Sequence, residues 1–330
     1  MNASNSKGGV PELGSRPAQG RGAAGPAGAT AGAEPAAAPV TGLPAGARPA
    51  DPGLTLIAVP IGAARDITLH ALDVLISADV LAAEDTRSLR KLMEIHGIAL
   101  RGRHIVAYHD HNGDRARPGL LAAMAEGKSV AYASEAGTPL IADPGFDLAR
   151  AARAAGYHVT TAPGVSAVVT ALSLAGLPTD RFYFGGFLPS QAKARQTALK
   201  SLVGIEATLV FYESPNRLVQ MLDAAAEALG AERTAAVCRE LTKKFEEVRT
   251  GTLSELSRSF QQSGAKGEIV VVIDRGEPLV LGQEEVSGML RDRLQHGDSV
   301  KDAVRLVMKD TGWARRDVYQ LALEVTKTES

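Results

Sequence analysis

Cysteine is almost absent from this sequence: the chain of 330 residues contains one, Cys238. A single thiol excludes a disulfide within the chain and a zinc site built from several cysteines. It also fits a reducing compartment, so we expect a cytoplasmic protein.

Long apolar runs and excess charge are lacking as well. No run of 18 or more apolar residues occurs, so the sequence predicts no membrane span. The N-terminus has no hydrophobic core of the signal-peptide kind. A net charge of −1 argues against a protein that coats polyanions with its whole surface, but it leaves room for a local basic patch.

The first 50 residues lack isoleucine and aromatic side chains and contain 14 Ala, 10 Gly and 7 Pro. Such a segment buries too little apolar surface to offset its ordering entropy, so we expect a disordered tail over residues 1–52. A targeting segment is the alternative. Four Lys or Arg against two Glu make the segment weakly basic, but it has no amphipathic pattern.

From Leu54 onward, short apolar runs alternate with helical patterns. The expected strands are Leu54–Val59, Val80–Ala83, His104–Tyr108, Lys128–Ala133 and Tyr157–Thr161, with helices near 69–77, 87–96, 114–126 and 145–155. Alternation with short connections predicts a mostly parallel sheet that is covered on both faces, in a domain spanning 53–177.

A second α/β set follows the turn cluster at 176–180, where we place a domain boundary. Its expected strands are Phe182–Phe187, Ala207–Tyr212, Thr234–Glu240, Glu246–Thr250 and Glu268–Asp274, with helices at 191–202, 215–228 and 252–261. This second α/β domain spans 178–278.

The last segment, 279–330, reads as helical. Helices are expected over Glu284–Gln295, from the capping Ser299 to about Lys309, and over Arg315–Val325, with a break at Thr311–Gly312. The tight glycine turn suggests a small helix-turn-helix unit. A helical pair that packs on the body is an equally good interpretation.

Polar and small residues follow all five strands of the first set. The loops begin at Val59, Glu84, His109, Ser134 and Ala162. Because ligands of open parallel sheets bind beyond the carboxyl ends of the strands, we expect a site there. Any one of these loops alone could be an ordinary tight turn.

The sequence does not support a dinucleotide site, a nucleoside triphosphate site, a hydrolase triad or a zinc site. The sequence has no G-x-G-x-x-G after its first strand, no phosphate-binding G-x-x-x-x-G-K-[ST] and no G-x-S-x-G elbow. The histidines 104, 109 and 111 show no familiar zinc spacing. A nucleoside without phosphates fits better, with backbone groups near small residues such as Gly137 meeting its base and ribose.

Eight motifs occur in order. They are Pro60-Ile61-Gly62 with Asp66-Ile67-Thr68; Glu84-Asp85-Thr86-Arg87; His109-Asp110-His111-Asn112; Ala136-Gly137-Thr138-Pro139 with Asp143-Pro144-Gly145; Pro163-Gly164-x-Ser166-Ala167; Gly186-Phe187-Leu188-Pro189; Phe211-Tyr212-Glu213-Ser214-Pro215-x-Arg217; and Arg239-Glu240-Leu241-Thr242-Lys243. Together, over about residues 54–275, they resemble the ribosomal RNA small subunit methyltransferase I family of the tetrapyrrole methylase superfamily. The final helices resemble that family's C-terminal segment.

This resemblance implies two α/β domains with S-adenosylmethionine between them, a homodimer and no metal. It implies 2′-O-methylation of a cytidine of 16S rRNA near the decoding site, as naked RNA or in the small ribosomal subunit. The implied cofactor contacts are Pro60, Ser134, Glu135, Ala136, Gly137, Thr138, Ser166, Ala167, Tyr212 and Glu213.

The chain departs from the family pattern at two positions. Glu135 stands where the family usually has Asp, and Ala63 stands where it favours Asn after Pro-x-Gly. A side-chain contact from position 63 is therefore lost or was never essential. At position 135 the longer side chain matters only if it holds the cofactor.

Catalysis needs an in-line arrangement of oxygen, methyl carbon and sulfur, and a base helps a poor nucleophile such as a ribose hydroxyl. The candidates for catalytic roles are Glu84, Asp85, Arg87 and His109, and Asp110 and Glu213 are further possible bases. Arg87 should lower the pKa of Asp85, which makes Asp85 a poor base but a good orienting group. His109 titrates in the useful range. Acidic capping of a helix is the structural alternative for Glu84–Arg87.

Basic residues that could contact RNA phosphates lie in several clusters, each of which could equally be a solvated face. They are Arg115, Lys193, Arg195, Arg217, Lys243, Lys244, Arg315 and Arg316. Tyr108, Phe187 and Tyr212 are candidates for base stacking.

Two other functions remain open. A tetrapyrrole C-methyltransferase would share the fold but would want a Gly-Pro-Gly-Asp first loop in place of Pro60-Ile61-Gly62-Ala63. A non-enzymatic RNA-binding protein on the same fold is the third possibility.

Overall fold

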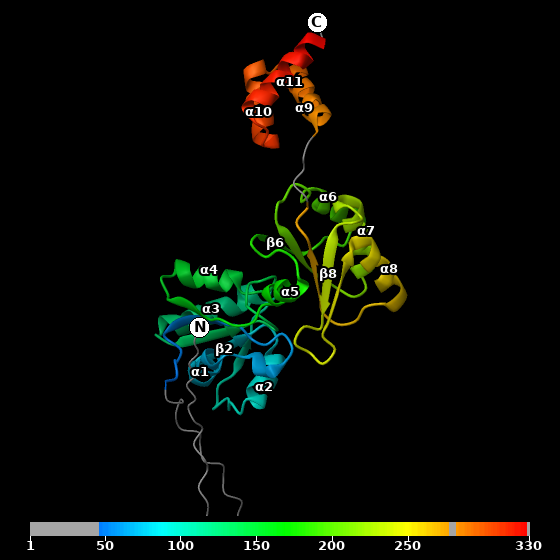
Figure 1. Ribbon diagram of the computed structural model, residues 1–330. Coiled ribbons are helices and arrows are strands. Elements are labelled where there is room, and N and C mark those ends of the chain that lie inside the picture. The colour runs from blue at the N-terminus through cyan, green and yellow to red at the C-terminus, as the bar shows by residue number, and fades with distance from the viewer. Residues whose placement is uncertain (1–45, 277–281, 329–330) are drawn as a thin grey trace, which may run out of the picture. The chain divides into compact units, whose positions relative to one another are not determined.

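The computed structural model describes residues 46–276 and 282–328 (Figure 1). Most of the predicted tail lies outside these residues. Its last residues, from 46 onward, contact the first domain, because the backbone N–H groups of Arg48 and Ala50 donate to the side chains of Asp73 and Ser77 on the first helix.

The first sheet is entirely parallel, as predicted, with the order β3-β2-β4-β1-β5. Its strands are β1 (Gly53–Ile57), β2 (Val80–Ala83), β3 (Ile105–Ala107), β4 (Ser129–Ala133) and β5 (Val159–Ala162). The connecting helices are α1 (Leu69–Ser77), α2 (Thr86–Ile95), α3 (Gly113–Ala125) and α4 (Phe146–Ala154), with a 3-10 turn η1 (Ala64–Asp66) before α1.

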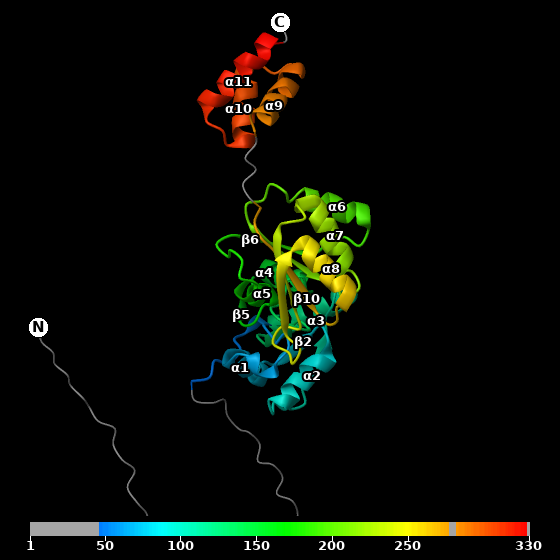
Figure 2. The same cartoon turned by 45° about the vertical axis from the view of Figure 1, so that its right-hand side comes forward.

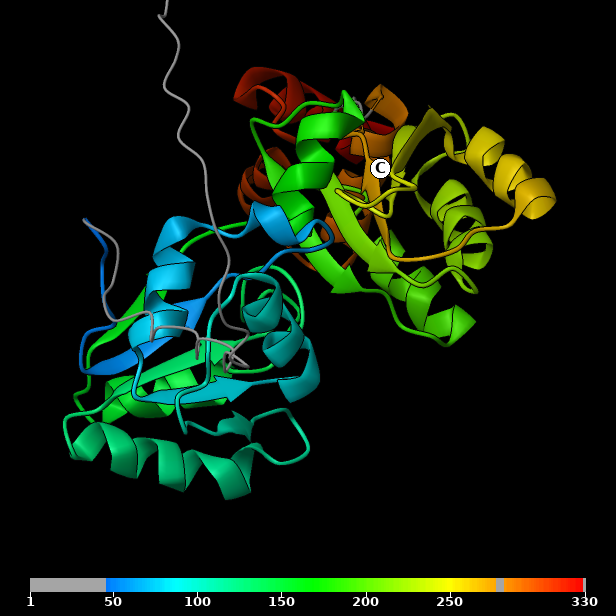
Figure 3. The same cartoon turned by 90° about the horizontal axis from the view of Figure 1, so that it is seen from below.

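Helices cover both faces of this sheet, as the strand–helix alternation predicts (Figure 3). Successive strand residues point to opposite faces, so Ala131 packs with α1 and α2 while Val130 and Tyr132 pack with α3 and α4. The central strands β2 and β4 are therefore largely apolar on both sides, and most polar residues lie in the loops at the strand ends.

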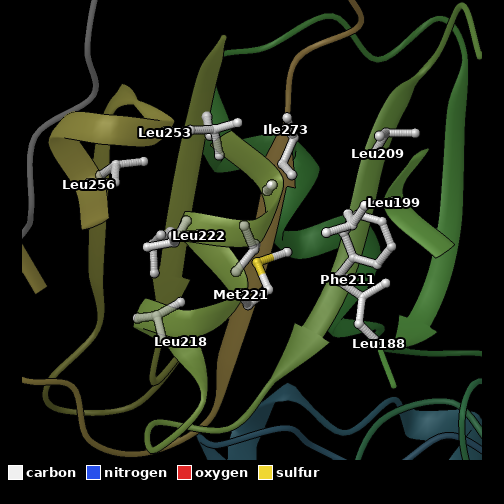
Figure 4. Close-up of a cluster of buried hydrophobic side chains, with 14 of the residues drawn as sticks. Leu188, Leu199, Leu209, Phe211, Leu218, Met221, Leu222, Leu253, Leu256 and Ile273 are labelled. Atoms are coloured by element: carbon white, nitrogen blue, oxygen red, sulfur yellow. The ribbon is translucent and has the colours of Figure 1, made fainter. Parts of the chain in front are cut away.

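The second sheet is mixed, with the order β6-β7-β10-β8-β9, and β6–β7 is its one parallel pair. Its strands are β6 (Phe182–Phe187), β7 (Thr208–Glu213), β8 (Thr234–Arg239), β9 (Glu247–Thr252) and β10 (Ile269–Ile273). The helices α6 (Ala192–Lys200), α7 (Leu218–Leu229) and α8 (Leu253–Ser263) lie together on one face (Figure 2). Figure 4 shows the core beneath them, with Leu209, Phe211 and Ile273 facing Met221 and Leu222 of α7.

The opposite face of the second sheet packs on α5 (Ala167–Ala175), a helix that the sequence patterns do not predict. Its sequence AVVTALSLA is apolar nearly all round, so it lacks the polar stripe that marks a helix in a pattern search. Val168, Ala171 and Leu172 lie against Val210, Ala236 and Val272. The helix that precedes the proposed boundary at 176–180 therefore belongs to the core of the second sheet.

Three C-terminal helices follow: α9 (Gln283–Gln295), α10 (Val300–Thr311) and α11 (Arg315–Thr328). All three bury apolar side chains on one another, with Leu290, Val307 and Leu321 among them. Gly312 has a φ of 70° and ends α10 in the left-handed conformation, which explains the break that the sequence predicts. The expected pair of helices is thus completed to a three-helix unit by α9.

Candidate active site

The loops after β1 and β4 are joined at the carboxyl edge of the first sheet. Val59 and Gly137 exchange two backbone hydrogen bonds of 2.9 and 3.0 Å. Gly137 has a φ of 71°, and a Cβ there would come within 3.3 Å of Ile61. A glycine is therefore required where these two loops cross.

The loop after β5 is fastened to the same edge. The Thr138 hydroxyl donates to the carbonyl of Val165 at 2.8 Å. A Cβ on Gly164 would lie 3.0 Å from the Cβ of Ala58, so this loop passes close to the end of β1. Three of the five predicted loops thus form one rim.

A cavity of about 440 Å³ opens between this rim and the second sheet. The second sheet supplies the ends of β6 and β7 and the start of β10, from Phe187, Tyr212–Pro215 and Gly267–Val270. Eight of the ten residues expected to hold a cofactor line it: Glu135, Ala136, Gly137, Thr138, Ser166, Ala167, Tyr212 and Glu213. The cavity size suits a small organic ligand.

The remaining two, Pro60 and Ser134, line a second pocket of about 520 Å³ that shares Glu135 with the first. Asp85 and Arg87 also line this second pocket, together with Lys91 of α2, whereas Glu84 lines the first. The Glu84–Arg87 group therefore spans both pockets.

Asp85 caps α2: its carboxylate accepts hydrogen bonds from the backbone N–H groups of Arg87 and Ser88 at 2.7 and 3.3 Å. The pKa of Asp85 is lowered as predicted, but mainly by the backbone N–H of Arg87, with the guanidinium a smaller cause. The capping interpretation of this group is thus confirmed for Asp85. Glu84 has a different task, because it accepts from the N–H of Glu135 at 3.1 Å and ties β2 to the loop after β4.

His109 is not brought to the site, since it lines neither cavity. Its backbone N–H donates to the side-chain oxygen of Asn112 at 2.8 Å, and its ring lies edge-on to the ring of His111. The preceding residue, Tyr108, is buried against Tyr132 and has no face free for base stacking. His109 therefore lies outside the lining of both pockets, and its catalytic role stays a prediction.

Acidic side chains dominate the polar lining. Glu84, Glu135, Asp143, Glu213 and Glu268 all reach the cavity. Glu213 is buried, with one oxygen accepting from the Ser214 N–H at 2.8 Å and the other 3.4 Å from Arg217. An electronegative cavity of this kind suits a cationic ligand and repels phosphate.

Asp143 is the site residue that the motif reading leaves without a role. Burial, reinforced by the charge of Glu84, raises the pKa of Asp143 to about 7; the Ser134 side chain lowers it, and Glu135 adds a smaller increase. A carboxyl that titrates near neutrality in a cavity is a functional candidate. Its position in Asp143-Pro144-Gly145, directly after a rim loop, was the available signal in the sequence.

Aromatic rings form part of the wall that the second sheet supplies. Phe187 and Tyr212 pack edge-to-face with ring centroids 5.6 Å apart, and Phe187 remains 57% exposed. Burial raises the pKa of Tyr212 to about 12, so this phenol stays protonated at neutral pH. The pair offers a stacking surface at the mouth of the cavity, in line with the expectation for both residues.

The basic residues suggested for RNA divide into two groups. Five are exposed: Arg115, Lys193, Lys244, Arg315 and Arg316. The other three are engaged within the protein. Arg217 donates to the Leu188 carbonyl at 2.6 Å, and Lys243 pairs with Glu240 and Glu268. Arg195 differs most from expectation, because it is 5% exposed and donates to the Ser190 carbonyl at 3.1 Å.

The two departures from the family pattern have little effect on the cavity. Ala63 lines neither pocket, and its backbone N–H donates to the Thr242 hydroxyl at 3.0 Å. Glu135 is held through its backbone by Glu84, and its side chain is exposed between the two pockets. The extra methylene of Glu135 therefore extends into open space.

Over residues 46–276 and 282–328, no group of three or more His, Cys, Asp or Glu side chains is arranged to hold a metal ion. Within the same described ranges, none of the helices combines the length and apolarity needed to cross a bilayer.

Comparison with known proteins agrees with this geometry. Residues 53–257 match the family model for Tetrapyrrole (Corrin/Porphyrin) Methylases, and residues 281–325 match that for the RsmI C-terminal HTH domain. The solved structures of cobalt precorrin-4 methyltransferase and diphthine synthase superpose with TM-scores of 0.53 and 0.54 at 17% and 19% identity. Each covers 67% of this chain, and 94% and 89% of the respective neighbour. At this identity the likeness shows the fold alone.

Curated relatives are much nearer in sequence. The ribosomal RNA small subunit methyltransferase I of Mesorhizobium japonicum is 44% identical over 86% of this chain and 95% of its own length. The protein of the same name from Halalkalibacterium halodurans is 40% identical over 81% of this chain and 93% of its own. The chain therefore belongs to the ribosomal RNA small subunit methyltransferase I family, on the tetrapyrrole methylase fold.

Proposed function

We propose that this protein uses S-adenosylmethionine to methylate 16S ribosomal RNA, at the 2′-hydroxyl of a cytidine near the decoding site. The observation that carries the proposal is the acid-lined cavity of about 440 Å³, formed in a chain that is 44% identical to a named rRNA methyltransferase. The choice of nucleotide and of the ribose oxygen follows from the motif resemblance.

The lining residues fit this cofactor. The small side chains of Ala136, Gly137 and Ala167 let an adenine edge and a ribose approach these loops closely, and the nearby carboxylates suit a sulfonium and an ammonium group. The same charges disfavour a nucleoside phosphate, in keeping with the missing phosphate-binding motifs. Bound there, S-adenosylmethionine supplies an electrophilic methyl carbon.

The protein's own contribution is alignment and exclusion of water. The crossed loops at Val59 and Gly137 fix one wall, and the Phe187–Tyr212 pair fixes the other. Glu84 holds the Glu135 loop in place through a backbone hydrogen bond, so it acts as a positioning residue. Asp85, fixed as a helix cap beside Arg87, is placed to orient the incoming nucleotide at the second pocket.

RNA binding requires positive charge outside the acidic cavity. The exposed Arg115, Lys193 and Lys244, and the adjacent Arg315 and Arg316 at the start of α11, are the groups that we assign to phosphate contacts. We also retain the homodimer and the cytoplasmic location as parts of this proposal.

The test is methyl transfer from labelled S-adenosylmethionine to small ribosomal subunits isolated from cells that lack the protein, followed by mass spectrometry of the rRNA nucleosides. A 2′-O-methylcytidine near the decoding site is expected. Naked 16S rRNA as acceptor decides between free RNA and the assembled subunit. Transfer to uroporphyrinogen instead, or binding of RNA without transfer, would overturn the proposal.

A further inference from the structure

The segment 139–145 has a strained backbone that no role assigned so far explains. Leu140 and Ala142 have φ values of 73° and 61°, in the left-handed region that non-glycine residues rarely adopt. Both precede Asp143, and Ala142 lines the cavity. Strain of this kind persists where the surrounding structure enforces it, and it concentrates at functional sites.

A buried scaffold holds the end of this segment. Tyr132 of β4 is fully buried, and its hydroxyl donates to the Pro144 carbonyl at 3.1 Å. Gly145 has a φ of 114°, and a Cβ there would lie 2.5 Å from the Tyr132 ring. Tyr108 supports that ring edge-on at 5.6 Å. The backbone directly after Asp143 is therefore anchored to the core of the first sheet.

The other acids of the cavity and its rim are mostly engaged. Glu84 accepts from the Glu135 N–H, Glu213 from the Ser214 N–H, and Glu268 pairs with Lys243. The described part of the chain supplies Asp143 with neither a cation nor a backbone N–H, and its nearest polar partner is Ser134. Glu135 is the remaining competitor, but its side chain is exposed to water.

We propose that Asp143 is the catalytic base, which takes the proton from the ribose hydroxyl that is methylated. In this step the 2′-oxygen forms a bond to the methyl carbon as the bond from that carbon to sulfur breaks. The electron pair of the broken bond stays on sulfur, which becomes a neutral thioether, and the hydroxyl proton moves to a carboxylate oxygen of Asp143. The assignment rests on the proposed function.

The groups around Asp143 set the pKa of its carboxyl. The negative charges of Glu84, after β2, and Glu135, after β4, raise the pKa of Asp143, and the Ser134 side chain lowers it. Tyr212, on β7, stays protonated at neutral pH. With a pKa of about 7, the carboxyl is a far stronger base than an ordinary aspartate and is still largely ionised just above neutrality. The rate of methyl transfer should therefore rise with pH and level off above about 7.

The experiment is single-turnover methyl transfer to unmethylated small subunits between pH 5.5 and 9, with cofactor binding followed by calorimetry. Asp143→Asn should slow transfer by about 100-fold or more and abolish the inflection near pH 7, while cofactor binding stays within a few-fold. Asp147→Asn is the matched control. Asp147 lies four residues later on α4, where it pairs with Arg150 at 2.8 Å on the surface, and its loss should leave rate and profile unchanged.

Glu84→Gln provides a second, independent readout. Removing this like charge should move the inflection of the surviving activity to lower pH, because Glu84 raises the pKa of Asp143. This shift tests whether Asp143 is the base even if Asp143→Asn does not fold. A fixed inflection in Glu84→Gln, or a normal rate and profile in folded Asp143→Asn, would overturn the assignment while leaving rRNA methylation intact. Absence of transfer by the unmodified protein would instead contradict the proposed function.

Discussion

The two sheets contribute different chemistry to one cavity. In the parallel first sheet every strand ends at the same edge, so its loops can gather Glu84, Glu135 and Asp143 on a single rim. The second sheet is mostly antiparallel, and the end of β7 there lies beside the start of β10, where Glu213 pairs with Ile269. The first sheet therefore supplies three of the five acids of the cavity, whereas the second sheet supplies Glu213 and Glu268 together with the aromatic pair Phe187 and Tyr212.

The difference between the two walls predicts that substitutions on them have different effects on kinetics. Substitutions on the rim of the first sheet should lower the rate of the bound complex, and substitutions on the aromatic wall should weaken binding.

Besides Asp143, the largest effect is expected at Asp85. Asp85→Ala should reduce transfer by about 100-fold through misplacement of the nucleotide, with cofactor binding changed no more than a few-fold. It should also lower the free energy of unfolding by about 1 kcal/mol, because the cap of α2 is lost. Single-turnover kinetics and urea unfolding measure the two effects.

Asp85→Asn separates these roles, since Asn caps helices as well as Asp does. We expect this variant to be as stable as the unmodified protein but still impaired in transfer. Full activity of Asp85→Asn would show that Asp85 is a helix cap and nothing more.

On the opposite wall, Phe187→Ala should raise the KM for the ribosomal substrate about 10-fold and leave kcat within about twofold, because a stacked base loses its aromatic partner. Leu323→Ala, which truncates another exposed apolar side chain, on α11, is the control for general loss of surface. Should kcat fall and KM stay constant, the division of labour between the two walls would be wrong.

Two cations on α6 give a smaller and sharper contrast. Lys193→Ala should weaken RNA binding and lower the slope of log affinity against log salt by about 1, with no change in Tm. Arg195→Ala should instead lower Tm, since its buried guanidinium holds the Ser190 carbonyl. Salt titrations and thermal melts of both variants test this, and equal effects of the two substitutions would contradict it.

The last prediction concerns stability against pH. Asp143 has a pKa of about 7 in the folded protein, well above the usual value of an aspartate, so the folded state binds the proton more tightly than the unfolded state does. Its protonation stabilises the fold below about pH 4, and this stabilisation is lost as the pH rises through 7. Melts at pH 5 and 8 should therefore show Asp143→Asn gaining in Tm over the unmodified protein at the higher pH. An equal difference in Tm between the two proteins at both pH values would show that the pKa of Asp143 is not raised by folding.

Much of the first sheet could be predicted from the sequence because its signals are local. All ten strands of the two sheets lie where the apolar runs predict them, with ends shifted by at most about two residues. The helix α5 was missed because it is buried against one sheet and apolar nearly all round, so no period marks it. The role of Asp143 was missed because its pKa depends on burial and on Glu84, which is 59 positions earlier in the chain.

The sequence by itself determined the alternation of strands and helices, the five polar loops and the motifs that place the chain in its family, because each depends on residues close together in the chain. Tertiary structure alone decided that Arg195 turns inward while Lys193 stays in water, and that His109 lies away from the cavity that Glu84 and Asp143 share. Burial and the field of neighbouring charges arise from side chains that are distant in sequence, and these come together only when the two sheets pack.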